Sequence, residues 1–439
     1  MSSILTNNSA MVALQTLKTI NSNMSDVQSQ ISTGKTIADA KDNSAVWAIS
    51  KVMEADVKGF KGISDSLNLG QSTVSVARQA SETVTDLLTD IKGKIVAAQE
   101  ENVDRDKIQA DIDALRDQIG AVVGAAQFNG LNLLQNTDTT AGSGSVNILS
   151  SLDRTGSGVT ASDITVRKQD LGIGASNIDY TATAVTAATD DLAVDGTGTQ
   201  VAHSIVGSTT ATADTSTIAF GTAASAAVTA GTGFEIQISA DGGVLDNLLD
   251  TSDGDLSYVA RDGETMADVA TAMAEKFNTY IEAQLGSGNT LGITATASGN
   301  TITIAGATNA AATDIFSINA EQYAAADTTI GGGLEELANI NVTTDAGVDQ
   351  ALTEIENLLQ TSIDAAASFG SAQGRIETQA SFISSLTDAL KSGIGTLVDA
   401  DMEEASARLQ ALQVQQQLGV QALSIANQAP QQLLSLFQG

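Results

Sequence analysis

The residue types that most often perform chemistry are scarce in this chain. Its 439 residues contain no cysteine and one histidine, His203. A thiolate nucleophile and a zinc-binding histidine pair are therefore both excluded. His203 stands in a Thr/Ala-rich segment, and we expect it to be a surface loop residue. The sequence predicts no catalytic residue, no cofactor and no metal site, so an enzyme is the least favoured class of protein.

Two further patterns resemble ligand-binding loops only weakly. Carboxylates gather at Asp250, Asp253 and Asp255, but their spacing is not that of an EF-hand calcium loop. The glycine runs at 172–174 and 331–333 lack the lysine of a phosphate-binding loop and a strand–helix–strand setting. We interpret the first pattern as an ordinary acidic turn and both glycine runs as turns.

The distribution of charge is more informative. The chain holds 52 Asp and Glu against 20 Lys and Arg, for a net charge of −32. This charge repels nucleic acid and anionic membranes, and no apolar run is long enough to be inserted into a membrane. Yet no side chain from Met1 to Leu17 is ionisable, and none after Arg408 is. Uncharged ends on an acidic protein predict that both ends are buried against protein.

Both ends are patterned as helices with apolar stripes. Near the N-terminus apolar residues follow alternating steps of three and four, which is the spacing of a coiled coil. The C-terminal segment has two stripes, one with Leu409, Leu412 and Leu423 and one with Val414 and Leu418, and a helix with two apolar faces has more than one neighbour. We therefore predict an assembly interface that comprises Leu14, Leu17, Ile20, Met24, Val27, Ile31, Leu409, Leu412, Val414, Leu418, Leu423, Leu433 and Leu436.

Longer helices are predicted next to these ends. Apolar spacing of three and four continues from Ile49 to Ile91, and it returns from Val348 to Leu390, while Asp104 is expected to cap a helix between them. A helix of about 50 residues extends roughly 75 Å, so its stripe must pair with another long helix, N-terminal against C-terminal. We expect breaks at residues 32–35 and at Gly393 and Gly395.

The middle of the chain has a different composition. From about residue 135 to 339 it is rich in Thr, Ala, Gly, Ser and Asp. Alternation at Phe234, Ile236 and Ile238 predicts a strand, residues 293–304 predict a hairpin, and residues 262–265 lead into a helix through Ile281. Strands are also expected at 146–149 and 164–166. This pattern predicts an α+β outer domain at about 201–330.

Several motifs, in chain order at both ends, resemble bacterial flagellin. They are Ile31-Ser-Thr-Gly-Lys-Thr-Ile37, Ala40-Lys-Asp-Asn-Ser-Ala45, Ala126-Gln-Phe-Asn-Gly130 and the terminal run from Ala426 to Phe437. The resemblance covers roughly residues 1–172 and 340–439. Residues 262–278 also resemble a small repeat of some flagellins and hook-associated proteins.

The resemblance implies an α+β fold in which long N- and C-terminal helices pair as an α-helical coiled-coil stalk, with a β-rich variable outer domain inserted between them. It implies a terminal-helix inner-tube domain at 1–42 and 398–439. A helical shell domain with a β-hairpin is implied at 43–172 and 340–397, and the variable outer domain at 173–339.

The resemblance also implies function and partners. We expect a structural subunit that self-assembles into the extracellular flagellar filament for motility, after export by the flagellar type III apparatus. The implied partners are the chain itself, hook-associated and filament-cap proteins and an export chaperone, without nucleic acid or membrane insertion. The alternatives are a hook–filament junction protein, or a secreted adhesin that uses flagellin-like ends for export.

One surface departs from the family pattern. In many flagellins the helix around residues 88–96 carries a basic and an apolar residue used by an animal innate immune receptor. Here Asp90 stands where Arg is expected, and Lys94 where Leu is expected. These changes invert one charge and put an ammonium group where an aliphatic side chain would be buried. We predict weak or absent receptor activation.

Overall fold

The computed structural model describes most of the chain. Its described residues are 7–155, 158–180, 203–208, 210, 212–221, 223–240, 245, 249, 251, 256–285, 291–308 and 314–437. Side chains are not described at 154–155, 203–204 and 429–437. The acidic residues Asp250, Asp253 and Asp255 therefore lie outside the description, as do the side chains of His203, Leu433 and Leu436.

The chain forms two compact units. The first comprises residues 1–65, 151–160 and 380–439, and the second comprises residues 66–150 and 161–379. Long helices supply much of both units: α1 (Asn8–Thr33), α2 (Ser44–Ala98), α3 (Arg105–Ala125), α5 (Asp345–Val398) and α6 (Met402–Phe437). The expected fold class is confirmed, because helical terminal regions flank a middle region that contains strands.

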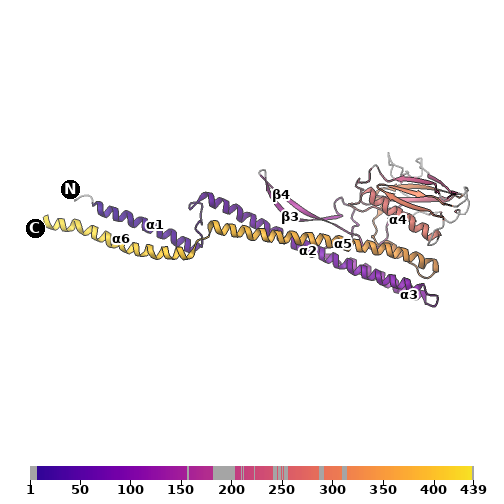
Figure 1. The fold of residues 1–439 in the computed structure, drawn as a ribbon, viewed down its shortest axis with the longest axis horizontal. Helices are drawn as coiled ribbons and strands as arrows, with labels where there is room; N and C mark the ends of the chain where they lie inside the picture. The colour runs from indigo at the N-terminus through magenta and orange to yellow at the C-terminus, as the bar shows by residue number, and fades with distance from the viewer. Residues whose placement is uncertain are drawn as a thin grey trace. The chain divides into compact units, whose positions relative to one another are not determined.

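In the first unit α1 runs beside α6, and the start of α1 and the end of α6 lie at the same end of this pair (Figure 1). Gly34 ends α1, as predicted: its φ is +70°, and its N–H donates to the carbonyl of Gln30 at 2.8 Å. The chain pairs again just beyond, where Ala400 N–H donates to the carbonyl of Gly34 at 3.0 Å.

The predicted break at Gly393 and Gly395 is wrong. Helix α5 continues through both glycines to Val398, and α6 begins after Asp401, whose Oδ1 accepts hydrogen bonds from the N–H groups of Glu403 and Glu404. A Cβ on Gly393 would lie 3.3 Å from Cε of Met53. Gly393 therefore allows α5 to pack closely against α2 and does not form a turn.

In the second unit α2 and α5 pair along their apolar stripes. Val74, Val84, Leu88 and Ile91 of α2 are buried, as predicted. Polar groups also join the helices: the hydroxyls of Thr85 and Ser362 lie 2.8 Å apart inside the pair. Helix α3 is capped by Asp104, whose carboxylate accepts from the N–H of Lys107.

The described residues of the outer domain, within the second unit, include a four-stranded sheet, a three-stranded sheet and the helix α4. A four-stranded antiparallel sheet has the order β6-β12-β8-β9, and a three-stranded sheet has the order β10-β11-β7. Helix α4 (Met266–Leu285) packs on them through a core that includes Phe220, Phe234, Phe277 and Phe316, all nearly inaccessible to solvent. The strands of these sheets are β6 (His203–Val206), β7 (Thr215–Ala219), β8 (Gly233–Ala240), β9 (Ser257–Val259), β10 (Thr294–Ser298), β11 (Thr301–Ala305) and β12 (Ile315–Tyr323).

The predicted hairpin is present, and the predicted strand segments lie in longer strands. Strands β10 and β11 pair antiparallel, with Ser298 opposite Thr301 and with Gly299 at φ +61° in the turn. Strands β3 (Ser145–Thr155) and β4 (Gly158–Arg167) form a separate two-stranded sheet, which includes the segments predicted at 146–149 and 164–166. Two shorter pairs are β1 (Gln127–Phe128) with β2 (Leu131–Asn132), and β5 (Asn177–Ile178) with β13 (Thr328–Thr329).

The glycine runs have a different role from the one predicted. Residues 171–176 form no turn, and they lie against residues 331–334. Gly332 N–H donates to the carbonyl of Gly174 at 2.7 Å, and Leu334 N–H donates to the carbonyl of Gly172 at 2.8 Å. A Cβ on Gly332 would lie only 2.0 Å from that Gly172 oxygen, so glycine permits the close approach of two backbones. Only Gly333 of the two runs lies in a turn, together with Leu334.

Candidate assembly interface

The terminal helices bury one side of their apolar residues against each other. Val27 of α1 and Ala405 and Leu412 of α6 are buried in one cluster, and partly buried Ile20, Met24, Ile31 and Leu409 pack against it. The predicted coiled-coil spacing in α1 therefore meets the first predicted stripe of α6. Ala405 belongs to the same cluster but was absent from the prediction, because a single alanine near the charged start of α6 does not stand out.

Uncharged polar groups complete this helix pair. Gln416 Nε2 donates to Asn21 Oδ1 at 2.8 Å, and Asn7 Nδ2 donates to the carbonyl of Ala426 at 2.8 Å. Close approach is possible at Gly419, where a Cβ would lie 3.0 Å from Cδ1 of Leu17. These contacts set the register of α1 on α6 without an ion pair.

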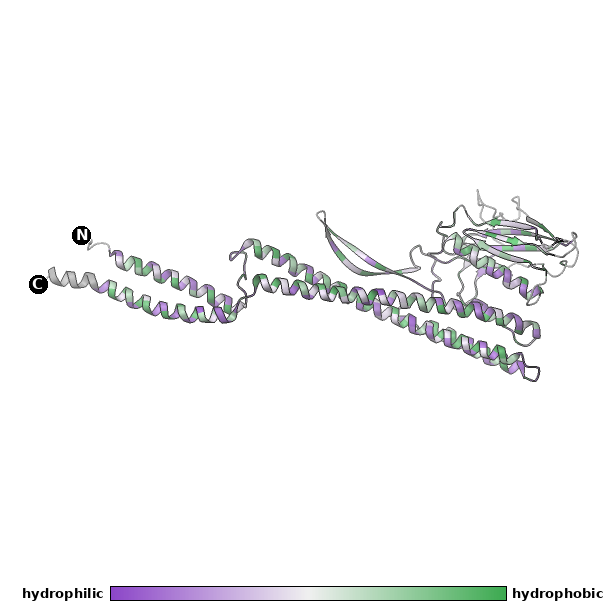
Figure 2. Ribbon diagram, viewed as in Figure 1, coloured by the Kyte–Doolittle hydropathy of each residue, from purple (hydrophilic) through white to green (hydrophobic). Residues whose placement is uncertain are grey.

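The second predicted stripe of α6 remains open. Val414, Leu418 and Ile425 are 55%, 58% and 68% exposed, and Leu14 of α1 is 52% exposed. Met11, Val12 and Val420 add to the exposed apolar residues, and Figure 2 shows apolar residues recurring along both helices. We call Leu14, Val414, Leu418 and Ile425 the open stripe. Because slightly more than half of each side chain is still exposed, covering it would stabilise an assembly by about 1–2 kcal/mol.

Most of the predicted interface residues fall into two groups. Ile20, Met24, Val27, Ile31, Leu409 and Leu412 meet inside the α1–α6 pair, while Leu14, Val414 and Leu418 face outward. Leu17 and Leu423 are half-buried. Sequence reasoning missed the exposed Met11 and Val12, which continue the N-terminal stripe toward the chain end.

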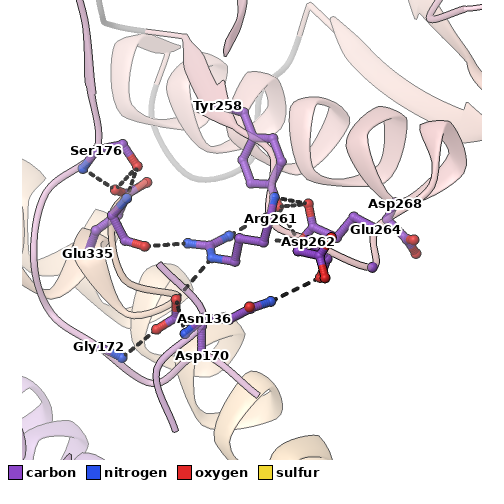
Figure 3. A network of polar contacts seen from close by, with 12 residues as sticks. Asn136, Asp170, Gly172, Ser176, Tyr258, Arg261, Asp262, Glu264, Asp268 and Glu335 are labelled. Atoms are coloured by element: carbon purple, nitrogen blue, oxygen red, sulfur yellow. Dashed lines mark hydrogen bonds and ion pairs between the residues drawn. The ribbon is translucent and has the colours of Figure 1, made fainter. Parts of the chain in front are cut away.

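A network of charged and polar side chains lies where the outer domain joins the helices. We call residues 167–176 and 331–336 the root of the outer domain. Arg261 is buried there, with Nε 3.2 Å from Asp170 Oδ2 and with Nη2 donating to the carbonyl of Gly331 at 3.1 Å. Figure 3 shows Tyr258, Arg261 and Asp170 converging.

The acidic side chains of this network stabilise the charge of Arg261. Burial acts to lower the pKa of Arg261, but Tyr258 and the carboxylates of Asp170, Glu264 and Glu335 outweigh it and raise that pKa. Burial raises the pKa of Glu264 more than Arg261 lowers it, and burial also raises the pKa of the Tyr258 hydroxyl. Arg261 therefore stays charged and holds the root together.

Backbone groups bind the same network to the preceding loops. Asp170 accepts from the N–H of Gly172 at 2.9 Å, and Asp262 accepts from the N–H of Gly144 at 2.7 Å. Asn136 Nδ2 donates to the carbonyl of Asp262 at 3.1 Å. Each carboxylate here is engaged in fixing backbone, so the arrangement is structural.

Asp90 and Lys94, where the receptor surface is predicted to be altered, both lie on α2. Asp90 is exposed, and the ammonium group of Lys94 forms an ion pair with Asp111 of α3. The structure therefore places both departures from the family pattern on an accessible face of the α2–α3 pair.

The described residues hold no metal-ion cluster and no helix that could cross a membrane. No cluster of three or more His, Cys, Asp or Glu among them could hold a metal ion. None of the helices in the described ranges has the length and apolar content needed to cross a membrane. Paired terminal helices with an exposed apolar face, together with a separately packed outer domain, are the architecture of a structural protein.

Comparisons with known proteins define the class further. Residues 4–139 match the bacterial flagellin N-terminal helical region, and residues 346–437 match the bacterial flagellin C-terminal helical region. Flagellin A of Rhizobium meliloti is 34% identical over 441 residues, and flagellin A of Rhizobium meliloti strain 1021 is 36% identical over 441 residues. Each match covers 100% of both chains.

A solved structure of the flagellar junction protein FlgL from Legionella pneumophila is far less similar. It is 11% identical, with a TM-score of 0.28, over 83% of this chain and 98% of that chain. The chain belongs to the flagellin family. It is accordingly a structural subunit of the extracellular bacterial flagellar filament, and the main functional prediction from sequence is confirmed.

Proposed function

We propose that the open stripe of α1 and α6 is the surface through which copies of this flagellin join in the filament. The observation that supports this is the exposure of Leu418 and Ile425 on a helix that carries no charge after Arg408. Adding a subunit would cover these side chains without bringing like charges together, which a chain of net charge −32 would otherwise do. The three-domain division at 1–42 and 398–439, 43–172 and 340–397, and 173–339 belongs to this proposal.

A charged substitution in the open stripe tests the proposal. Leu418→Glu would place a carboxylate in the contact between copies while leaving the buried cluster around Leu412 unchanged. Seeded polymerisation followed by electron microscopy should then give no elongation. The matched control is Thr271→Glu on the exposed face of α4, which should elongate as the parent does. Normal filaments from Leu418→Glu would contradict the proposal, provided that circular dichroism shows the helices intact.

We also propose that an export chaperone covers the apolar C-terminal helix before assembly, and that cap and hook-associated proteins meet the same terminal helices. The open stripe supports this, because an exposed apolar face on a secreted monomer favours aggregation. Light scattering of the monomer mixed with the organism's flagellar chaperone should show a complex. An equally tight complex with a chain ending at Arg408 would show that the chaperone binds elsewhere.

We further propose that the α2 surface around Asp90 and Lys94 activates the animal innate receptor weakly or not at all. Asp90 presents the opposite charge from the family's usual residue, and Lys94 is engaged with Asp111. A reporter-cell assay should show low potency, and Asp90→Arg combined with Lys94→Leu should raise it. Potency equal to that of an enterobacterial flagellin in the unchanged chain would refute this proposal.

A further inference from the structure

A buried carboxyl group lies in a groove between α4 and α5, inside the second unit. Glu354 of α5 is only 5% exposed, and it has no hydrogen bond or ion pair within the described part of the chain. The groove has a volume of about 910 Å³ and is lined by Lys276 and Thr279 of α4 and by Asn357 of α5. An ionisable group in this position is costly to charge, because water and partners are both limited.

The charged side chains that face Glu354 already form ion pairs with one another. Lys276 Nζ lies 3.2 Å from Glu335 Oε1 and 2.5 Å from Glu336 Oε1. Glu336 also accepts from Asn339 Nδ2 at 2.6 Å, and Glu335 accepts from the N–H of Ser176 at 2.7 Å. The ammonium group of Lys276 is therefore already shared by the carboxylates of Glu335 and Glu336, and Glu354 would be a third carboxylate near it.

Two further carboxylates of α4 complete the surroundings. Glu275 lines the groove, and burial raises its pKa. Glu282 accepts a hydrogen bond at 3.2 Å from the hydroxyl of Thr353, the residue before Glu354. A negative charge on Glu354 would therefore add to an excess of acidic groups on the facing helix.

The protonation states follow from these contacts. Burial and then Glu336 raise the pKa of Glu354 to about 8, against the opposing effect of Lys276. Burial acts to lower the pKa of Lys276, but Glu336 and Glu335 outweigh it and raise that pKa. Burial acts to raise the pKa of Glu335, but Lys276 and Ser176 lower it overall. At neutral pH Lys276 is charged and Glu354 mostly holds its proton.

We propose that Glu354 makes the contact between α4 and α5 sensitive to pH, so that loss of its proton loosens the outer domain from α5. In the closed contact the pKa of Glu354 is about 8, whereas a hydrated Glu354 in an opened contact returns to about 4.5. Between these values the closed state binds more protons than the open state. The closed contact therefore loses stability as pH rises from about 4.5 to about 8, and it loses no more above that range.

Hydrogen exchange of the full-length monomer tests the proposal. After correction for the intrinsic exchange rate, the opening equilibrium of amides in α4 should rise between pH 6 and pH 8 and level off above. One proton changes an equilibrium at most tenfold per pH unit, so the rise is at most about 100-fold. A flat profile in the parent chain would overturn the proposal.

One variant and one matched control make the assignment to Glu354 specific. Glu354→Gln keeps the shape of the side chain but cannot ionise, so its profile should be flat. Asp364→Asn removes one charge from an exposed position of the same helix, and it should keep the rise of the parent. A rise in Glu354→Gln equal to that of the parent would contradict the proposal.

A third variant covers the case in which Glu354→Gln does not fold. Lys276→Met removes the cation that lowers the pKa of Glu354. The exchange profile of this variant should level off at a higher pH than in the parent chain. An unchanged or lower levelling pH would count against Glu354 as the titrating group.

Discussion

The α1–α6 pair and the outer domain bury apolar residues in opposite ways. The outer domain closes its core around Phe220, Phe234, Phe277 and Phe316, which are all nearly inaccessible to solvent. The helix pair buries Val27 and Leu412 but leaves Leu418 and Ile425 exposed. The outer domain therefore satisfies its own apolar residues within one chain, whereas the helix pair leaves a face for another chain to cover. The outer domain is therefore stable within one chain, and assembly is proposed for the α1–α6 pair.

A cavity in the outer-domain core should separate the two regions most strongly. Phe277→Ala removes a fully buried ring from α4, and we expect a loss of about 3–5 kcal/mol in unfolding free energy of the outer domain. Urea unfolding of the monomer measures this loss. Seeded filaments should still grow, and Thr271→Ala on the exposed face of α4 should change neither property. If Phe277→Ala subunits failed to elongate filament seeds, the outer domain and the α1–α6 pair would not be independent.

The root of the outer domain should give the next largest effect. Arg261→Ala leaves the buried carboxylate of Asp170 without its guanidinium partner, and we expect a cost of about 3 kcal/mol. The midpoint of thermal unfolding should fall in Arg261→Ala. Lys107→Ala, which removes an exposed ion pair, should leave that midpoint unchanged. A midpoint that is equal in Arg261→Ala and in the parent would mean that the network adds no stability.

The cap of α4 should give the smallest effect of this series. Thr265 and Asp268 hydrogen-bond reciprocally at the start of the helix, with Asp268 Oδ2 2.7 Å from the N–H of Thr265. Thr265→Ala should cost about 1 kcal/mol, measured by urea unfolding of the monomer. The matched variant Thr271→Ala should differ from the parent by less than about 0.5 kcal/mol. Equal losses in both variants would remove the cap as the cause.

The helices were predictable because their determinants are local. Spacing of three and four marked the buried faces of α1, α2 and α5, and Asp104 and Gly34 marked two true helix ends. Gly393 and Gly395 misled the prediction, since a glycine inside a helix costs only about 1 kcal/mol, and Gly393 also lies close to Met53 of α2. The sequence Asp401-Met-Glu-Glu carried the true start of α6 as a capping pattern.

The polar sites were not predictable because their partners are distant in sequence. Arg261 meets Asp170 and Gly331, which lie 91 and 70 positions away. Glu354 resembles any other helical glutamate in the sequence, and only the fold brings it beside Lys276 and Glu336. The two stripes of α6 were recognisable, and the first of them packs against α1, but sequence alone did not assign a partner to each stripe.

Hydroxyl-radical footprinting of side chains in monomers and filaments tests the assembly proposal most directly. Oxidation of Leu14, Val414, Leu418 and Ile425 should fall when the subunits polymerise, because neighbouring copies cover the open stripe. Val159, an exposed residue of β4, provides an internal reference in each spectrum. We expect at least a several-fold loss of labelling on the open stripe. Equal labelling of the stripe in monomers and filaments would contradict it.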